Sequence, residues 1–144
     1  MVLYFSKMSE HYELGKKGEQ LAVDYLKKEG YKIEERNWRF QKAEIDIIAS
    51  KQQTIISVEV KTRSSKDFGN PQDFVNSKKI KLMVAAMNEY ILMKNLDTEV
   101  RFDIIAITNI KGEFDINHIM THFYTFNLIL SIAFLIHIYF LELK

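Results

Sequence analysis

The sequence predicts an α/β fold in which a mixed β-sheet is flanked by helices, in the order α-β-β-β-α-β-β. Two segments have apolar residues at helical spacing, and five have the β-branched or alternating pattern of strands. The length of 144 residues is that of one ordinary domain. With no Cys, one Pro and five Gly, the composition excludes a disulfide-stapled scaffold and a low-complexity chain.

The first helix is predicted over about Ser9 to Glu29. Apolar residues recur three, four and seven positions apart between Leu14 and Leu26, which gives this helix one apolar face. Gly15 and Gly18 lie inside the helix, where glycine is unfavourable relative to alanine. We therefore expect another part of the backbone to approach the helix closely at these glycines.

Three strands are predicted next, over Tyr31 to Arg39, Ala43 to Ser50 and Thr54 to Thr62. The last of them is especially rich in the β-branched residues Ile, Val and Thr. The connections between the three segments are short and polar, which favours an antiparallel meander.

The second half of the chain contributes one helix and two strands. Ser77 is suited to cap a helix that runs to about Met93, with its apolar residues on one face. Strands are predicted over Val100 to Thr108 and Asp115 to Met120. The helix between the third and fourth strands makes a long crossover, so we expect a sheet with parallel and antiparallel pairs.

The most informative side chains lie on the second and third predicted strands. Strand side chains alternate between faces, so Glu59 and Lys61 share one face of the third strand. The opposite face is apolar and is expected to face the core; its residues are Ile56, Val58 and Val60.

On the second strand, Asp46 lies among isoleucines. Alternation places Glu44, Asp46 and Ile48 on one face of the strand. The same rule places Ile45 and Ile47 together on the other face. An ionised carboxylate in such an apolar segment needs a partner, because burying it unpaired is very costly.

If these two strands form a hairpin, Asp46 and Glu59 approach each other on the same face. Two neighbouring carboxylates repel unless a cation lies between them, and a hard divalent ion such as Mg²⁺ accepts this ligand set. Lys61 would then orient or deprotonate a water, or stabilise charge on a phosphate. These parts match metal-assisted phosphodiester hydrolysis. The alternative is an ordinary solvated salt bridge between Glu59 and Lys61.

The spacing D-x12-E-x-K from Asp46 to Lys61 resembles the PD-(D/E)xK motif of restriction-endonuclease-like nucleases and of archaeal Holliday-junction resolvases. The closer resemblance is to the bacterial YraN-type family of predicted endonucleases, over about Leu14 to Tyr124. Position 45 is Ile where the motif has Pro, which is not needed for the chemistry. The motifs that carry the resemblance are Gly15-Lys16-Lys17-Gly18-Glu19, Arg36-Asn37-x-Arg39, Glu44-Ile45-Asp46, Val58-Glu59-Val60-Lys61-Thr62-Arg63, Pro71, Lys78-Lys79 and Arg101-Phe102-Asp103.

The resemblance implies a restriction-endonuclease-like fold and a divalent-metal-dependent nuclease that acts on DNA, including branched or damaged DNA. Asp46, Glu59 and the Val60 carbonyl would bind Mg²⁺ or Mn²⁺. Lys61 would act on the attacking water. Glu19 would reach the site from the first helix; without the resemblance it is interpreted as an exposed helix carboxylate. A junction-cleaving enzyme of this kind is expected to form a homodimer.

Two other functions remain open: a non-catalytic nucleic-acid-binding module of the same fold, and an interaction protein tethered to a membrane. Basic residues beside the proposed site favour contact with a nucleic-acid backbone, whereas the alternative for them is a solvated surface. These residues are Arg36 and Arg39 on the first strand, and Arg63, Lys66, Lys78 and Lys79 after the third.

Charge is unevenly distributed, although 20 Lys+Arg and 19 Asp+Glu give a net charge of only +1. The 19 residues from Phe123 to Leu141 are almost all apolar, close to the roughly 20 that a transmembrane helix needs. They are interpreted as a membrane anchor, as a helix packed on the domain or on a second copy, or as an extension without selected function.

We predict a domain over residues 9–123 and an apolar extension over 124–144. The N-terminus has no signal-peptide pattern, so a cytoplasmic location is expected.

Overall fold

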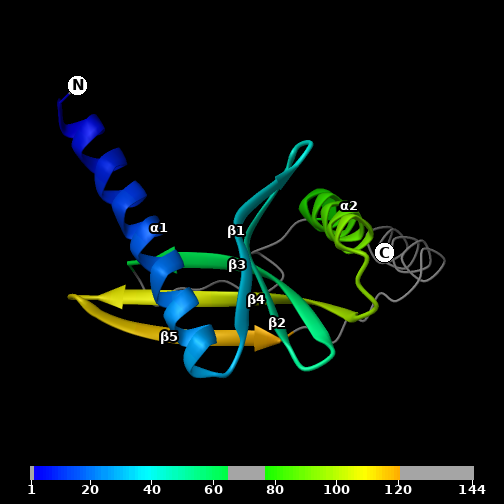
Figure 1. The fold of residues 1–144 in the computed structure, drawn as a ribbon. Coiled ribbons are helices and arrows are strands. Elements are labelled where there is room, and N and C mark those ends of the chain that lie inside the picture. Colours follow the sequence, from blue (N-terminus) through cyan, green and yellow to red (C-terminus); the bar gives the residue numbers. More distant parts are fainter. Residues whose placement is uncertain (1, 65–76, 121–144) are drawn as a thin grey trace, which may run out of the picture.

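The computed structural model describes residues 2–64 and 77–120, which form a five-stranded sheet with a helix on each face (Figure 1). The helices are α1 (Val2–Lys28) and α2 (Ser77–Lys94). The strands lie side by side in chain order, as β1 (Lys32–Phe40), β2 (Ala43–Lys51), β3 (Thr54–Arg63), β4 (Glu99–Ile110) and β5 (Glu113–Met120).

The sheet is mixed. Strand β3 pairs in parallel with β4, whereas the pairs β1–β2, β2–β3 and β4–β5 are antiparallel. The predicted α/β class, the element order and the crossover through α2 are confirmed, and the arrangement is consistent with a restriction-endonuclease-like fold. Most predicted ends agree with the structure within two residues, but α1 begins at Val2 instead of near Ser9.

Each helix covers its own hydrophobic cluster, which explains why the central strands are apolar on both faces. Under α1, Ala22, Val23 and Leu26 pack on alternate residues of β2, β3 and β4. Under α2, Ala86 and Met87 pack on a second set from β2, β3 and β4. Fully burying one large aliphatic side chain stabilises a fold by roughly 1.5–3 kcal/mol, so the two clusters fix both helices on the sheet.

Strand β2 separates from β3 halfway along its length. The β2–β3 pairing runs from Lys51↔Thr54 to Ile47↔Val58 and stops there, while β1 stays paired with β2 as far as Ala43. The outer half of the β1–β2 hairpin therefore projects past β3 (Figure 1).

The separation also changes which face the side chains of β2 occupy. Ile45 and Ile48 both pack in the cluster under α2, whereas Ile47 packs in the cluster under α1. The prediction that Ile45 and Ile47 share a face is therefore wrong. Regular alternation requires an undistorted strand, and it fails here because β2 leaves β3 between these residues while it stays paired with β1.

Helix α1 touches β3 at Gly18. A Cβ added to Gly18 would lie 1.8 Å from Thr62 Oγ1 and 2.9 Å from Thr62 Cβ, so only glycine fits there. The predicted close approach is thus present at Gly18, although it is to a side chain. It is absent at Gly15, where a Cβ would meet no atom within 4 Å.

This contrast gives a paired stability prediction. Gly18→Ala is expected to lower the free energy of unfolding by about 1–3 kcal/mol, because α1 must move away from the stiff Thr62 side chain. Gly15→Ala is expected to raise it by about 0.5–1 kcal/mol through helix propensity alone. Urea denaturation of both variants tests this. A gain in stability from both substitutions would show that the Gly18 contact is not restrictive.

In the part of the chain that the structure describes, no helix is long and apolar enough to cross a bilayer. The apolar run from Phe123 to Leu141 lies outside the described residues, and so do the predicted boundary at residue 123 and the predicted extension over 124–144. Lys66 and Pro71 also fall outside them.

Candidate active site

Two carboxylates meet where β2 separates from β3. Glu59 on β3 is only 2% exposed, and Asp46 on β2 is half-buried. The Val60 amide donates a hydrogen bond to Asp46 Oδ2 at 2.7 Å. Because Val60 lies beyond the last β2–β3 pair, the Asp46 side chain satisfies an amide that the β2 backbone does not reach. The structure thus brings the two predicted carboxylates to one point of the sheet.

Asp46 is held in an environment that disfavours its charge. Burial raises the pKa of Asp46 to about 6, and the neighbouring Glu59 carboxylate adds to this effect. The hydrogen bond from Val60 and the ammonium of Lys79 lower the pKa, but they do not outweigh burial. A carboxyl in this situation is stabilised in its charged form by any cation that comes between the two acids.

Glu59 has two lysines on one carboxylate oxygen. Lys61 Nζ lies 2.5 Å from Glu59 Oε1, and Lys79 Nζ contacts the same atom. The other oxygen, Oε2, is buried and has no hydrogen-bond partner in the described structure. Sequence reasoning placed Lys79 among the nucleic-acid-binding residues, but the first turn of α2 brings it onto this carboxylate. That contact joins distant segments, and no local pattern indicates it.

Glu19 lies at the edge of the site, on α1. Its Oε2 is 3.4 Å from Asn37 Nδ2, and its charge contributes to the raised pKa of Asp46. Asn37 lies between the Arg36↔Ile47 and Trp38↔Ile45 pairs of the β1–β2 register and has a φ of 50°, a left-handed conformation in which Asn is enriched. Sequence reasoning included Asn37 only as part of a motif; the structural signal is this unusual backbone beside the site.

The donor set suits a hard divalent ion. Across residues 2–64 and 77–120, no three His, Asp or Glu side chains gather as metal ligands, so the site offers two carboxylates, Asp46 and Glu59. Mg²⁺ and Mn²⁺ accept such a pair and complete their coordination with water and other oxygens. The buried, unpartnered Oε2 of Glu59 is an atom that a cation would satisfy. The residues therefore fit the predicted ion.

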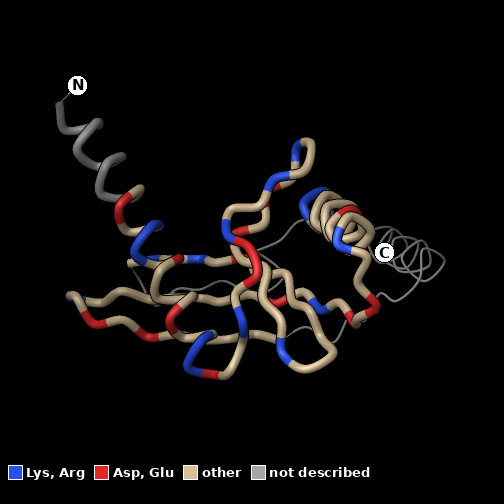
Figure 2. Tube along the Cα trace, viewed as in Figure 1, with Lys and Arg blue, Asp and Glu red and all other residues tan. Residues whose placement is uncertain are grey.

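Basic residues lie on the β1–β2 hairpin, at the end of β3 and on α2, and Figure 2 shows Lys and Arg positions on the hairpin and on α2. On the hairpin, Arg36 donates a hydrogen bond to Gln20 of α1, and Arg39 forms an ion pair with Glu44. Between the hairpin and α2 is a hollow of about 350 Å³, which we call the lysine hollow. Arg63 is exposed at the end of β3. The residues that line the lysine hollow are Lys42, Ala43, Glu44, Lys78, Lys79, Leu82 and Met83.

The sequence matches the family model of uncharacterised protein family UPF0102 over residues 18–107. The chain belongs to the UPF0102 family. This result confirms the predicted YraN-type resemblance. The matched span contains Glu19, Asp46, Glu59 and Lys61, together with Lys79.

UPF0102 relatives are similar over most of the chain. Proteins of this family from Flavobacterium psychrophilum and Christiangramia forsetii are 58% and 56% identical over 119 residues. Each alignment covers 83% of this chain and 100% of the relative. A UPF0102 protein of Bacteroides fragilis is 50% identical over 117 residues, which is 81% of this chain and 97% of the relative.

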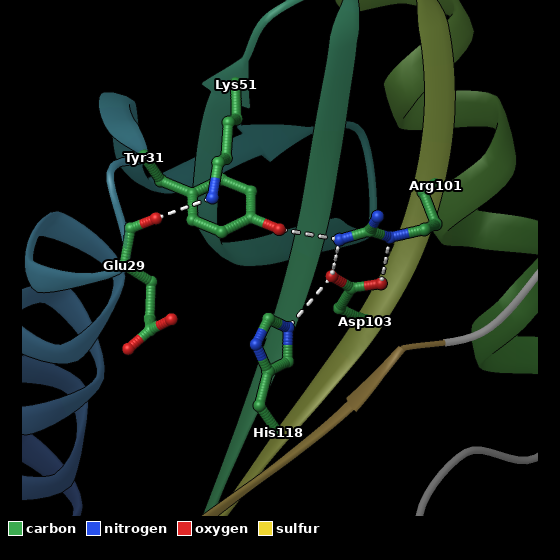
Figure 3. Close-up of polar contacts among 6 residues, drawn as sticks. All are labelled: Glu29, Tyr31, Lys51, Arg101, Asp103 and His118. Carbon is green, nitrogen blue, oxygen red and sulfur yellow. Dashed lines mark hydrogen bonds and ion pairs between the residues drawn. The ribbon is translucent and has the colours of Figure 1, made fainter.

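This UPF0102 chain also contains a second polar cluster, around the buried Asp103 on β4 and β5 (Figure 3). Arg101 Nε and Nη2 donate to the two oxygens of Asp103 at 2.8 and 2.7 Å. His118 Nε2 lies 2.9 Å from Asp103 Oδ2, and Arg101 Nη2 also donates to the Tyr31 hydroxyl at 2.9 Å. Asp103 itself is 1% exposed.

Hydrogen bonding decides the charge of Asp103. Burial alone would raise its pKa, but the hydrogen bonds from His118 and Arg101 outweigh burial and lower the pKa below the usual value. No local sequence pattern links His118 to Asp103. His118 is paired with Ile105 and lies diagonally across from Asp103, a relation that only the β4–β5 register reveals.

Proposed function

We propose that this UPF0102 chain is a divalent-metal-dependent nuclease that hydrolyses phosphodiester bonds in nucleic acid, with DNA, including branched or damaged DNA, as its substrate. The observation that carries the proposal is the position of Asp46 beside the buried Glu59, whose carboxylate also forms an ion pair with Lys61. These are the three residues of the D-x12-E-x-K motif.

Each residue of the site has a role in this proposal. Asp46 and Glu59, with the Val60 carbonyl, would hold Mg²⁺ or Mn²⁺, which supplies Lewis-acid stabilisation of phosphate charge and a more acidic water. Lys61 orients the attacking water and stabilises negative charge on the phosphate, because its ammonium forms an ion pair with Glu59. Glu19 would act from α1 through its charge, reaching the site directly or through a water.

The phosphate backbone would run along the basic side chains that flank the carboxylates. Lys78 and Lys79 line the lysine hollow, and Arg36 and Arg39 lie on the adjoining hairpin. Contacts of this kind are independent of base sequence and weaken as salt rises. Arg63, which is exposed at the end of β3, would extend the same surface, and Lys66 is proposed as a further phosphate contact although it lies outside the described residues.

One observation favours the second candidate function, a nucleic-acid-binding module without turnover. Lys61 and Lys79 both form ion pairs with Glu59, so the chain itself supplies cations to this carboxylate. A protein that only binds nucleic acid requires no more than this, since lysines and arginines supply backbone affinity. Metal dependence therefore distinguishes the two functions.

A cleavage panel tests the proposal. Single-stranded, duplex, flap and four-way-junction DNA are incubated with the protein in Mg²⁺, in Mn²⁺ and in EDTA. We expect metal-dependent cleavage that Asp46→Asn abolishes and that Asp115→Asn, an exposed position on β5, leaves unchanged. If the original chain binds DNA as strongly in EDTA as in Mg²⁺ and cleaves none of the substrates, the result would instead support the binding module.

A further inference from the structure

The charges at the candidate active site balance before any metal ion enters. Asp46 and Glu59 supply two negative charges when both are ionised, and Lys61 and Lys79 supply two positive charges. Both ammonium groups contact Glu59 Oε1, next to the unpartnered Oε2. A divalent ion bound to this carboxylate would therefore lie close to two like charges, and Coulomb repulsion would favour the departure of one lysine.

The structure distinguishes the two lysines by where they can go. Lys61 is attached to β3 two residues from Glu59, on a strand that is paired with β4 along its whole length. Lys79 belongs to another element, α2, and its residue also lines the lysine hollow together with Lys42 and Lys78. Of this pair only Lys79 is among the residues that line the lysine hollow, and that location suits a phosphate, because two further lysines line it.

We propose that Lys79 competes with the divalent ion for Glu59 and, once the ion is bound, turns into the lysine hollow to contact a phosphate of the nucleic acid. Lys79 is thus a positioning residue that couples the two binding events. The metal ion releases the phosphate-binding lysine, and a phosphate in the hollow removes the competitor of the metal ion. By thermodynamic linkage, each ligand raises the affinity for the other by the same factor. This inference rests on the proposed function, because it assumes that the carboxylates bind a metal ion.

The first measurement is metal affinity without nucleic acid. Mn²⁺ is titrated calorimetrically into the full chain and into Lys79→Met, with Lys78→Met as the matched control from the same helix turn. Lys79→Met is expected to bind Mn²⁺ about tenfold more tightly than the original chain, a typical size for such coupling. Lys78→Met is expected to match the original chain, because Lys78 lines the hollow without an ion pair to Glu59 in the described structure.

The second measurement is the coupling itself. Binding of a fluorescent DNA duplex is followed by anisotropy with and without Ca²⁺, which supplies a divalent charge in place of Mg²⁺. Ca²⁺ is expected to tighten DNA binding by the original chain and to have a smaller effect on Lys79→Met. Lys78→Met is expected to weaken DNA binding by the same factor in both conditions. Lys79→Arg keeps the positive charge, so its metal affinity is expected to return towards the original value.

The outcomes separate this inference from the proposed function. If the original chain binds Mn²⁺ and Asp46→Asn abolishes that binding, the metal site stands. If Lys79→Met then binds Mn²⁺ with unchanged affinity, the role of Lys79 is overturned while the metal site stands. The same holds if Lys78→Met tightens Mn²⁺ binding as much as Lys79→Met does. If the original chain binds no Mn²⁺, the proposed metal-dependent function fails, and the inference fails with it.

Discussion

Lys61→Met is expected to reduce metal-dependent cleavage by about 10²–10⁴-fold, the usual contribution of a positioned acid–base group. It is expected to do so without weakening Mn²⁺ binding, because the variant keeps both carboxylates and removes a positive charge from Glu59 Oε1. Single-turnover cleavage and Mn²⁺ titration of the same preparation measure the two effects separately. A loss of cleavage with no loss of Mn²⁺ affinity would show that Lys61 acts in the chemistry and not in metal binding.

Lys111→Met is the control for this prediction, because Lys111 is exposed in the turn between β4 and β5. It removes the same charge from the chain without touching the site, so cleavage and metal binding should both persist. If Lys61→Met cleaved as fast as Lys111→Met, then Lys61 would be a structural partner of Glu59, and its role in the proposed chemistry would be wrong.

Asp103→Ala is expected to lower the free energy of unfolding by about 3–5 kcal/mol, the usual cost of removing one partner of a buried ion pair. The substitution leaves the Arg101 guanidinium, whose side chain is 15% exposed, without its carboxylate and removes the acceptor for His118. Urea denaturation at pH 7 measures the loss. Asp115→Ala, on the exposed side of β5, is expected to change stability by no more than about 0.5 kcal/mol.

The Asp103 carboxylate is also expected to make the stability of the fold depend on pH. The pKa of Asp103 in the folded chain lies below its ordinary value of 3.8, so the charged form stabilises the fold. That contribution is complete above the ordinary pKa and is lost as pH falls through the lower, folded value. The difference in stability between the original chain and Asp103→Asn should therefore shrink below about pH 4. A constant difference down to pH 2 would contradict this assignment.

The sequence was sufficient for the sheet, because strand patterns in this chain are local. β-branched runs such as Thr54–Arg63 and short polar turns define β2 and β3 without reference to the rest of the fold. The start of α1 was less well predicted. No Pro or Gly between Val2 and Ser9 ends the helix, so it extends well beyond the expected first residue.

The candidate site was predictable in its residues but not in its geometry. Asp46 and Glu59 stand out because acids are costly in apolar strands. Their approach, however, does not depend on the regular alternation from which it was predicted, since β2 leaves β3 at this point. The contact of Lys79 with Glu59 depends on how α2 is placed on the sheet, and no periodicity within either segment contains that information.

The separation of β2 from β3 has a consequence for how the molecule opens. Strand β3 is paired with β4 at ten consecutive positions, so we expect the amide hydrogens around Glu59 to exchange only when the sheet itself unfolds. Asp46 lies at the base of the projecting half of the hairpin, which has no β3 partner. Local unfolding of that half would carry Asp46 and the adjoining basic residues away from Glu59. Such an opening would widen the space between the two carboxylates while the β3–β4 pairing stays intact.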